Sequence, residues 1–202
     1  MSDVSGLTVR QQLLEAAIVV VDEHGEAALR VRDLLETVGV TAPTLYHHFG
    51  TRQDLVDEVQ AERFNRTMRM DFPVFIDAVN ASKSREDLLA AIRVAFTLRD
   101  DPSRLLIRFQ RLNAFGSAYA RPALARRIMD MHEYWAREVA AALRPFQESG
   151  IIRRDVNLEM LVAWYNGATV GKLLVEIGPS TLDVAQWNII MSDALEHMLF
   201  GT

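Results

Sequence analysis

The sequence contains no cysteine, which excludes disulfide bonds and metal sites built from thiolates. A chain without disulfides suits a reducing compartment, so we expect a cytoplasmic protein. The longest apolar run near the N-terminus covers residues 16–21 and is far too short to span a bilayer. The opening MSDVSGLT is polar and acidic, unlike a signal peptide, so we expect no membrane association.

Enzyme motifs are also missing from the sequence. It has no glycine-rich phosphate loop, no nucleophile motif and no HExxH zinc motif. The adjacent pair His47 and His48 is poorly spaced for a metal, because neighbouring side chains on a helix point about 100° apart. We therefore expect neither an enzyme nor a bound metal or cofactor.

Positive charge is scarce in the first third of the chain. The whole sequence carries a net charge of −5, and residues 1–62 hold four basic and eleven acidic side chains, a net charge of −7. If this part of the chain binds a nucleic acid, its few cations must be gathered on one face. We then expect the acidic pairs at 22–23 and 57–58 on the solvated opposite side.

Helical periodicity and capping patterns predict an all-α chain with no strand. Capping-box patterns mark helix starts at Thr8, Thr51, Ser84 and Ser180. Proline and glycine punctuate the pattern, and we expect a break at residues 71–73. The expected helices cover residues 8–24, 31–38, 41–48, 51–70, 84–99, 101–117, 122–149, 157–177 and 180–200.

Two of the short expected helices, joined by VGVT, have the layout of a helix-turn-helix. Gly39 allows the tight turn, Val40 packs between the helices and Thr41 caps the second helix. Pro43 lies in the first turn of that helix, where a missing N–H group costs little. In this arrangement the second helix enters a DNA groove.

The segment VRDLLETVGVTAPTLYHHFGTRQDLVDEV resembles the DNA-binding domain of the tetracycline-repressor (TetR) family. The resemblance covers about residues 8–60, and the remainder is similar only in being helical. It implies a DNA-binding domain over residues 1–52 and a helical ligand-binding and dimerisation domain over residues 53–202. The matching positions are Leu34, Leu35, Gly39, Val40, Thr41, Leu45, Tyr46, His48, Phe49, Thr51, Arg52 and Leu55.

The resemblance implies a role for each residue of the second short helix. Leu45 and Phe49 face inward and hold the helix on its domain. Thr41, Tyr46 and Arg52 contact phosphates. The candidates for contact with base edges are Ala42, Pro43, Thr44 and His47, of which the last two can form hydrogen bonds.

Other readings of these residues stay open. Tyr46 and Phe49 could be core aromatics, and His48 could pack within the domain. Arg30 stands where the family has a Ser or Thr cap; arginine accepts no hydrogen bond, so this cap is weakened by roughly 1 kcal/mol. Arg30 and Arg32 are nevertheless candidate DNA contacts, since they would supply positive charge. Arg32 and Arg52 could instead be ordinary solvated charges.

Family members dimerise through their last two helices, so the resemblance implies a homodimer. In this sequence Ala163, Gly167 and Gly171 recur every four residues and would permit close helix approach. Packing of the same residues within the chain is the alternative. The opposing large or apolar candidates on the last helix are Trp187, Met191, Ala194, Leu195 and Met198.

The resemblance also implies a small-molecule pocket among the middle helices. Its candidate lining residues are apolar with a few polar groups, as pockets tend to be, although residues at such spacing can also be ordinary core. The sequence does not name the effector. The candidates are Phe64, Met68, Phe96, Phe109, Asn113, His132, Trp135 and Tyr165.

Together these features predict a ligand-responsive transcriptional regulator, a repressor that binds a palindromic double-stranded DNA operator as a homodimer. A small-molecule effector would release it. The alternative is a helical scaffold or partner-binding protein that has lost DNA affinity, which the acidic first 62 residues motivate.

Overall fold

A computed structural model describes residues 6–100, 104–179 and 181–201, without the side chains of residues 96–100. Its described part is helical and contains no strand, as predicted. None of its helices combines the length and the apolar character that crossing a membrane would require. The helices are α1 (Val9–His24), η1 (Glu26–Ala28), α2 (Val31–Val38), α3 (Ala42–Phe49), α4 (Arg52–Ala81), α5 (Arg85–Asp100), α6 (Leu105–Ala118), α7 (Pro122–Glu148), α8 (Leu158–Gly171), α9 (Leu173–Glu176) and α10 (Val184–Phe200).

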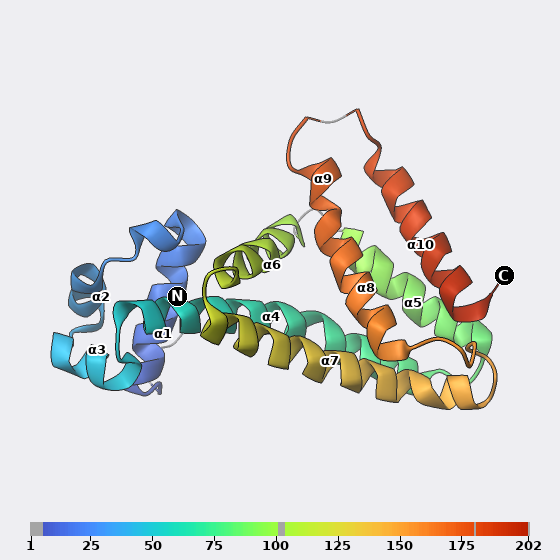
Figure 1. Cartoon of the computed structure of the whole chain (residues 1–202), viewed down its shortest axis with the longest axis horizontal. Helices are drawn as coiled ribbons and strands as arrows, with labels where there is room; N and C mark the ends of the chain where they lie inside the picture. Colours follow the sequence, from blue (N-terminus) through green and yellow to red (C-terminus); the bar gives the residue numbers. More distant parts are fainter. Residues whose placement is uncertain (1–5, 101–103, 180, 202) are drawn as a thin grey trace.

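The first three α-helices and the start of α4 form a small unit at one end of the molecule (Figure 1). Its core is aliphatic apart from one phenylalanine, and each helix contributes the face that carries its apolar periodicity. The buried residues are Leu13, Leu14, Ala17, Ile18, Val21, Leu29, Leu34, Leu45, Phe49, Leu55, Val56 and Val59.

Capping explains where several helices begin. Thr8 with Gln11 and Thr51 with Asp54 form the predicted capping boxes at the starts of α1 and α4. Thr41 does not cap α3 through its side chain, contrary to the prediction. Its hydroxyl instead lies 3.1 Å from the hydroxyl of Thr44. The backbone N–H of Thr44 already donates to the carbonyl of Thr41 (3.1 Å), so the first turn satisfies this donor without a side chain.

The predicted break at residues 71–73 is wrong, because α4 continues through Pro73 to Ala81. A proline inside a helix costs about 3 kcal/mol, since it removes a hydrogen bond and crowds the preceding turn. Here the helix is held on both sides of the proline. Phe72 and Val79 are buried, and the carboxylate of Asp71 accepts a hydrogen bond from Arg111 (2.9 Å).

The larger part of the molecule is built around α4 and α7, which pack along each other, with α5, α6, α8 and α10 around them (Figure 1). Two details near the C-terminus differ from or complete the prediction. The helix expected over residues 157–177 is interrupted at Lys172, beside Gly171, a residue of weak helix propensity. The Trp187 ring lies close to Gly171, because a Cβ added there would be 3.5 Å from it. Asp183 caps α10 by accepting a hydrogen bond from the N–H of Ala185 (2.8 Å).

Two predicted helix starts fall outside the described residues. They are the start at residues 101–102 and the Ser180 cap. The other predicted boundaries agree with the structure to within a few residues, including the Ser84 cap, whose hydroxyl accepts from the N–H of Asp87 (3.1 Å).

Candidate nucleic-acid interface and core cavity

Helix α3 is anchored by its two buried side chains. Leu45 is fully buried and Phe49 is 6% exposed, so both face inward as predicted. The guanidinium group of Arg10 lies 5.0 Å from the centre of the Phe49 ring, a cation–π contact that ties α1 to the end of α3. These contacts fix which side of α3 faces outward.

The outward side of α3 brings the candidate DNA contacts together. Tyr46 is 45% exposed, which excludes the reading of this residue as a core aromatic. Thr41, Pro43 and His47 are also exposed. Ala42 and Thr44 are half-buried at the start of the helix. The result is a surface with a phenol, an imidazole and small polar or apolar groups within two helical turns.

The two adjacent histidines have different surroundings. His47 is exposed and His48 is half-buried, with its ring edge-on to both His47 (5.4 Å between ring centres) and Phe49 (6.4 Å). His48 therefore packs within the domain. Among the described residues, no group of three His, Cys, Asp or Glu side chains is placed to hold a metal ion.

Arg30 and Arg32 flank this surface at the start of α2. Arg30 occupies the cap position and makes no capping hydrogen bond through its side chain, as its chemistry predicts. The side chain of Arg32 is 84% exposed and lies 3.4 Å from Glu36 and 3.8 Å from Asp33. Exposed ion pairs of this kind contribute little to the stability of the fold. Arg32 can therefore leave its carboxylate partners and bind a phosphate with little loss of stability.

Arg52 has a structural contact that the sequence did not predict. Its guanidinium group donates through Nε (3.1 Å) and Nη2 (2.9 Å) to the carbonyl of Leu29, and through Nη2 to the carbonyl of Glu26 (3.4 Å). Arg52 thus ties the start of α4 to the turn that leads into α2. Its remaining N–H groups are the ones that could meet a phosphate.

The acidic pairs expected on the solvated opposite side divide: Asp22 and Glu23 are exposed, whereas Asp57 and Glu58 are not. Asp57 is 9% exposed, and Asp22 pairs with the buried Arg63 (2.7 Å). Glu15 accepts a hydrogen bond from Nη1 of Arg66 (3.0 Å). These acids face cations from later in the chain.

Acidic side chains of the N-terminal unit also bind residues of the larger part of the molecule, where the two parts meet. Arg121, the residue just before α7, binds the carboxylate of Glu26 and lies 3.3 Å from Asp57. Ser117 on α6 donates to Glu26 (3.1 Å), and Gln110 donates to Asp22 (2.9 Å). Three arginines from beyond residue 62, Arg63, Arg66 and Arg121, therefore pair with acids of the −7 segment.

The pKa of Glu26 reflects this junction. Burial raises the pKa of the carboxyl group, but hydrogen bonds from Arg121, Gln60 and Ser117 and the charge of Arg121 together outweigh it. The pKa of Glu26 consequently lies below its ordinary value of 4.5, so the carboxylate is ionised at neutral pH.

The larger part contains a small apolar cavity. It lies between α4, α5, α7, α8 and α10, far from α3 along the long axis of the molecule (Figure 1). Almost all of its lining is aliphatic or aromatic. The lining residues are Phe72, Phe75, Ile92, Ala95, Val139, Leu143, Leu161, Val162, Tyr165, Leu195 and Leu199.

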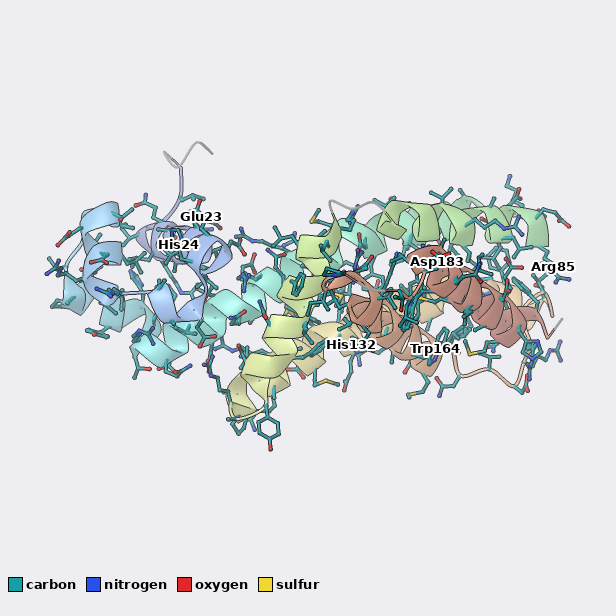
Figure 2. The ribbon with its side chains drawn as sticks, turned by 90° about the horizontal axis from the view of Figure 1, so that it is seen from above. Glu23, His24, Arg85, His132, Trp164 and Asp183 are labelled. Atoms are coloured by element: carbon teal, nitrogen blue, oxygen red, sulfur yellow. The ribbon has the colours of Figure 1, made fainter. Side chains whose placement is uncertain are left out.

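Only Tyr165 among the candidate pocket residues with described side chains lines this cavity. Phe64 and Met68 are buried in the closed core beside it, and Trp135 stacks on Phe72 with 5.7 Å between ring centres. Phe64, Met68 and Trp135 therefore pack as core residues, which was the alternative to a role in a ligand pocket. His132, labelled in Figure 2, is half-buried.

The remaining pocket candidates lie elsewhere. Asn113 is exposed on α6, Phe109 is half-buried on the same helix, and the side chain of Phe96 lies outside the described residues. The sequence missed Phe72 and Phe75 because the expected break at 71–73 removed them from any helix. An uninterrupted helical period through Pro73 would have placed both beside Met68.

The candidate dimer residues divide between the core and the surface. Met191 and Leu195 are buried in the chain's own core (5% and 8% exposed), so they cannot provide a free face of α10. Ala163, Ala194 and Met198 are half-buried, and Trp187 covers Gly171 within the chain. Gly167 is exposed, with no atom close to the position of an added Cβ.

Large apolar side chains are instead exposed on α8, α9 and α10 and in the segment between α9 and α10. Trp164, labelled in Figure 2, is 39% exposed on α8. Single exposed apolar side chains are common, but a run of them over neighbouring helices indicates a contact surface. The others are Met160, Leu174, Ile177, Leu182, Ile189 and Ile190.

Comparison with known proteins identifies the first part of the chain. The model of the family "Bacterial regulatory proteins, tetR family" matches residues 13–59. The HTH-type transcriptional repressor KstR2 of Mycobacterium tuberculosis is 40% identical over 50 residues, 25% of this chain and 25% of the repressor. The HTH-type transcriptional repressor ComR of Escherichia coli is 30% identical over 95 residues, 46% of this chain and 45% of ComR. The matched region thus spans about a quarter to a half of these relatives' length.

Solved structures extend the similarity to the whole fold. Salmonella enterica GusR superposes with a TM-score of 0.67 at 17% identity, over 96% of this chain and 97% of GusR. A transcriptional regulator from Saccharomonospora viridis in complex with choline gives a TM-score of 0.65 at 18% identity, over 94% and 96% of the two chains. At these identities the shared property is the fold.

Proposed function

Because residues 13–59 match the model of the tetR family of bacterial regulatory proteins, we propose that the chain is a cytoplasmic transcriptional repressor that binds a palindromic DNA operator as a homodimer. A small-molecule effector would release it from the operator. Residues 1–52 would form the DNA-binding domain and residues 53–202 the ligand-binding and dimerisation domain.

The outer side of α3 carries this proposal. Its inner side is fixed by Leu45 and Phe49, so Tyr46 and His47 project from a rigid helix. We assign phosphate contacts to Thr41, Tyr46 and Arg52. We assign further phosphate contacts to Arg30 and Arg32, which are exposed at the start of α2. We assign base contacts to Ala42, Pro43, Thr44 and His47, because these side chains occupy the first turns of a recognition helix.

The homodimer follows from the demands of operator recognition. One short recognition helix gives limited specificity, whereas a dimer reads two half-sites about 34–36 Å apart. We place the dimer interface on the exposed faces of α8 and α10, around Trp164, Gly167 and Ile190. Three of the predicted interface residues are half-buried and could border this surface: Ala163, Ala194 and Met198. Two others, Met191 and Leu195, are buried and would support it from beneath.

Effector control requires a connection between the cavity and α3. Helix α4 begins beside α3 and lines the cavity with Phe72, so one element reaches both sites. We propose that an effector in the cavity shifts α4 and changes the spacing of the two recognition helices. A typical coupling free energy for such an effect is about 1–3 kcal/mol.

Selection of bound DNA from a random pool is the decisive experiment for the DNA role. A palindromic sequence would support both DNA binding and the homodimer. On the selected DNA, Tyr46→Phe should weaken binding, because it removes one hydroxyl from the phosphate contact, and Tyr134→Phe is the control with a similarly exposed ring (45% and 49%). Equal loss in the two variants, or no enriched sequence, would contradict the proposal.

The scaffold alternative loses its main motivation in the structure. It rested on the acidity of residues 1–62, and many of those acids pair with Arg63, Arg66 and Arg121. These pairs offset part of the negative charge of residues 1–62.

A further inference from the structure

The lining of the apolar cavity determines which ligands it can hold. Its described wall consists of aliphatic and aromatic side chains from α4, α5, α7, α8 and α10, together with the hydroxyl group of Tyr165. None of the described side chains that line it is charged. Moving an ionised group from water into such surroundings is very costly, whereas burial of an apolar group is favourable. The cavity therefore selects against ions of either sign.

Two charged side chains follow lining residues directly in the sequence but lie on the outside. Ile92 on α5 and Leu195 on α10 line the cavity and are 2% and 8% exposed. The next residues, Arg93 and Glu196, have side chains that are 66% and 30% exposed and lie 3.5 Å apart. This ion pair joins α5 to α10 at the surface and leaves the inner faces of the two helices apolar.

The free volume of the cavity limits the size of a ligand. It is about 50 Å³. A single buried water occupies roughly 10–15 Å³ of such space, so the cavity as it stands holds about three to five non-hydrogen atoms. An apolar cavity offers water few hydrogen-bond partners and takes up apolar atoms instead. The fitting ligand is therefore small as well as apolar.

Two helices of the cavity wall extend to the other surfaces considered above. Phe72 lies on α4, the helix that follows α3, and its ring stacks on Trp135 with 5.7 Å between ring centres. Leu195 and Leu199 lie on α10, which also exposes Ile190. A molecule that fills the cavity thus contacts the helix that leads to α3 and a helix of the proposed dimer surface.

From this lining and this volume we propose that the effector is a small uncharged molecule of hydrocarbon character. It would lie among the side chains of Phe72, Leu143 and Leu195. An ion of the same shape would be rejected, because no described side chain of the wall can compensate its charge. The inference rests on the proposed function for the role of effector, whereas the ligand class depends only on the cavity.

The competing explanation is that the cavity is a packing void without a regulatory role. A void of this kind would also prefer apolar atoms, but its occupation would leave DNA binding unchanged. The two explanations therefore differ in one measurable quantity, the affinity for the selected DNA with and without an apolar ligand.

The ligand class is tested by titration of the full chain at pH 7.5, followed by NMR of its leucine and valine methyl groups. The probes are 2-methylpropene, acetate and trimethylammonium, which each have four non-hydrogen atoms and differ in charge. We expect 2-methylpropene to shift the methyl signals of Leu143, Val162 and Leu195 and to bind tenfold or more tightly than either ion. Equally tight binding of an ion, or no binding of 2-methylpropene, overturns the proposal.

A variant that fills the cavity locates the ligand. Ala95 lines the cavity on α5, so Ala95→Leu should abolish binding of 2-methylpropene. The matched control is Ala90→Leu, at an exposed position of the same helix, which should bind as the wild type does. Unchanged binding in Ala95→Leu would place the ligand elsewhere and overturn the assignment.

A variant that enlarges the cavity gives an independent test if Ala95→Leu does not fold. Leu143→Ala should admit benzene, because the space it vacates joins the existing cavity. Leu124→Ala removes a similarly buried leucine of α7 that does not line the cavity (0% exposed, against 4% for Leu143), and it should bind benzene at least tenfold more weakly. Equal affinities in the two variants would contradict the assignment.

DNA binding separates this inference from the proposed function. Saturating 2-methylpropene should weaken binding of the wild-type chain to the selected DNA by about fivefold or more and leave Ala95→Leu unaffected. If the probe binds in the cavity but the affinity for DNA stays the same, the cavity is a packing void and the effector class is overturned. If the chain binds no DNA sequence selectively, the proposed function fails, while the affinity ratio still decides which ligands the cavity accepts.

Discussion

The guanidinium group of Arg121 binds the carboxylate of Glu26 across 95 positions of the chain. It joins the residue before α7 to the 3₁₀ turn that precedes α2, and the same guanidinium group also lies 3.3 Å from Asp57. The small N-terminal unit is therefore attached to the larger part by polar contacts in addition to the α4 connection.

Replacement of Arg121 by glutamine should weaken this junction. Two carboxylates would lose their cation, and the side chain of Arg121 is only 24% exposed, so we expect the free energy of unfolding to fall by about 1–3 kcal/mol. Chemical denaturation measures this change. Arg137→Gln, in an exposed pair, should change it by less than about 0.5 kcal/mol; equal changes in the two variants would show that the junction contributes nothing.

His132 should make the stability of the protein depend on pH. Burial lowers its pKa below 6.5, and although Glu133 raises the pKa, Arg111 lowers it further. Its Nε2 lies 3.3 Å from the amide nitrogen of Asn166 and accepts that N–H only when the ring is neutral. The neutral ring is favoured in the folded state, so its contribution is present above pH 6.5 and is lost as the pH falls through the lowered pKa.

Thermal unfolding between pH 5 and 8 tests this dependence. The wild-type protein should lose stability as the pH falls below 6.5, and His132→Asn should flatten that part of the curve. His24→Asn is the control, because the side chain of His24 is 65% exposed. An unchanged pH curve in His132→Asn would assign the dependence to other groups.

Gly167 offers a direct test of the proposed dimer. An added Cβ at Gly167 meets nothing within 4 Å in its own chain, so Gly167→Leu should leave the monomer folded and obstruct a partner on α8. Sedimentation velocity should then show monomer. Gly116→Leu is the matched control, because Gly116 is also exposed and helical with open space around it. A dimer that persists in Gly167→Leu would move the interface elsewhere.

Arg32 and Arg52 should respond differently to removal of charge. Arg32→Gln should leave stability unchanged and reduce the slope of log affinity against log salt by about 1, since its exposed side chain pairs with Asp33 and Glu36 on its own helix. Arg52→Gln should also lower the free energy of unfolding by about 1 kcal/mol, because it releases the carbonyl of Leu29. DNA titrations at several salt concentrations and denaturation curves distinguish the two outcomes.

The N-terminal unit could be predicted closely from the sequence because its signals are local. The capping boxes at Thr8 and Thr51, the turn at Gly39 and the apolar period of α1 each depend on residues within one or two turns. The resemblance to the tetR family, carried by the same short segment, implied Leu45 and Phe49 on the inner side of α3 and Tyr46 facing outward.

The parts that could not be predicted depend on contacts between distant residues. Pro73 is a helix breaker by its local chemistry, and only the ion pairs and burial around Asp71 and Phe72 keep α4 continuous. Arg121 gives no sign in the sequence that it faces Glu26. The cavity was missed for the same reason, since its lining comes from five helices whose packing no local pattern specifies.

The continuity of α4 has a mechanical consequence. From Arg52 beside α3 to Phe72 at the cavity there are 20 residue steps, or roughly 30 Å at 1.5 Å per residue. A rod of that length works as a lever: a tilt of about 5° at the cavity end displaces the other end by roughly 2–3 Å. A broken helix would absorb such a tilt at the break, whereas the unbroken helix delivers it to α3, and in a symmetric dimer two such levers would act on the distance between the half-sites.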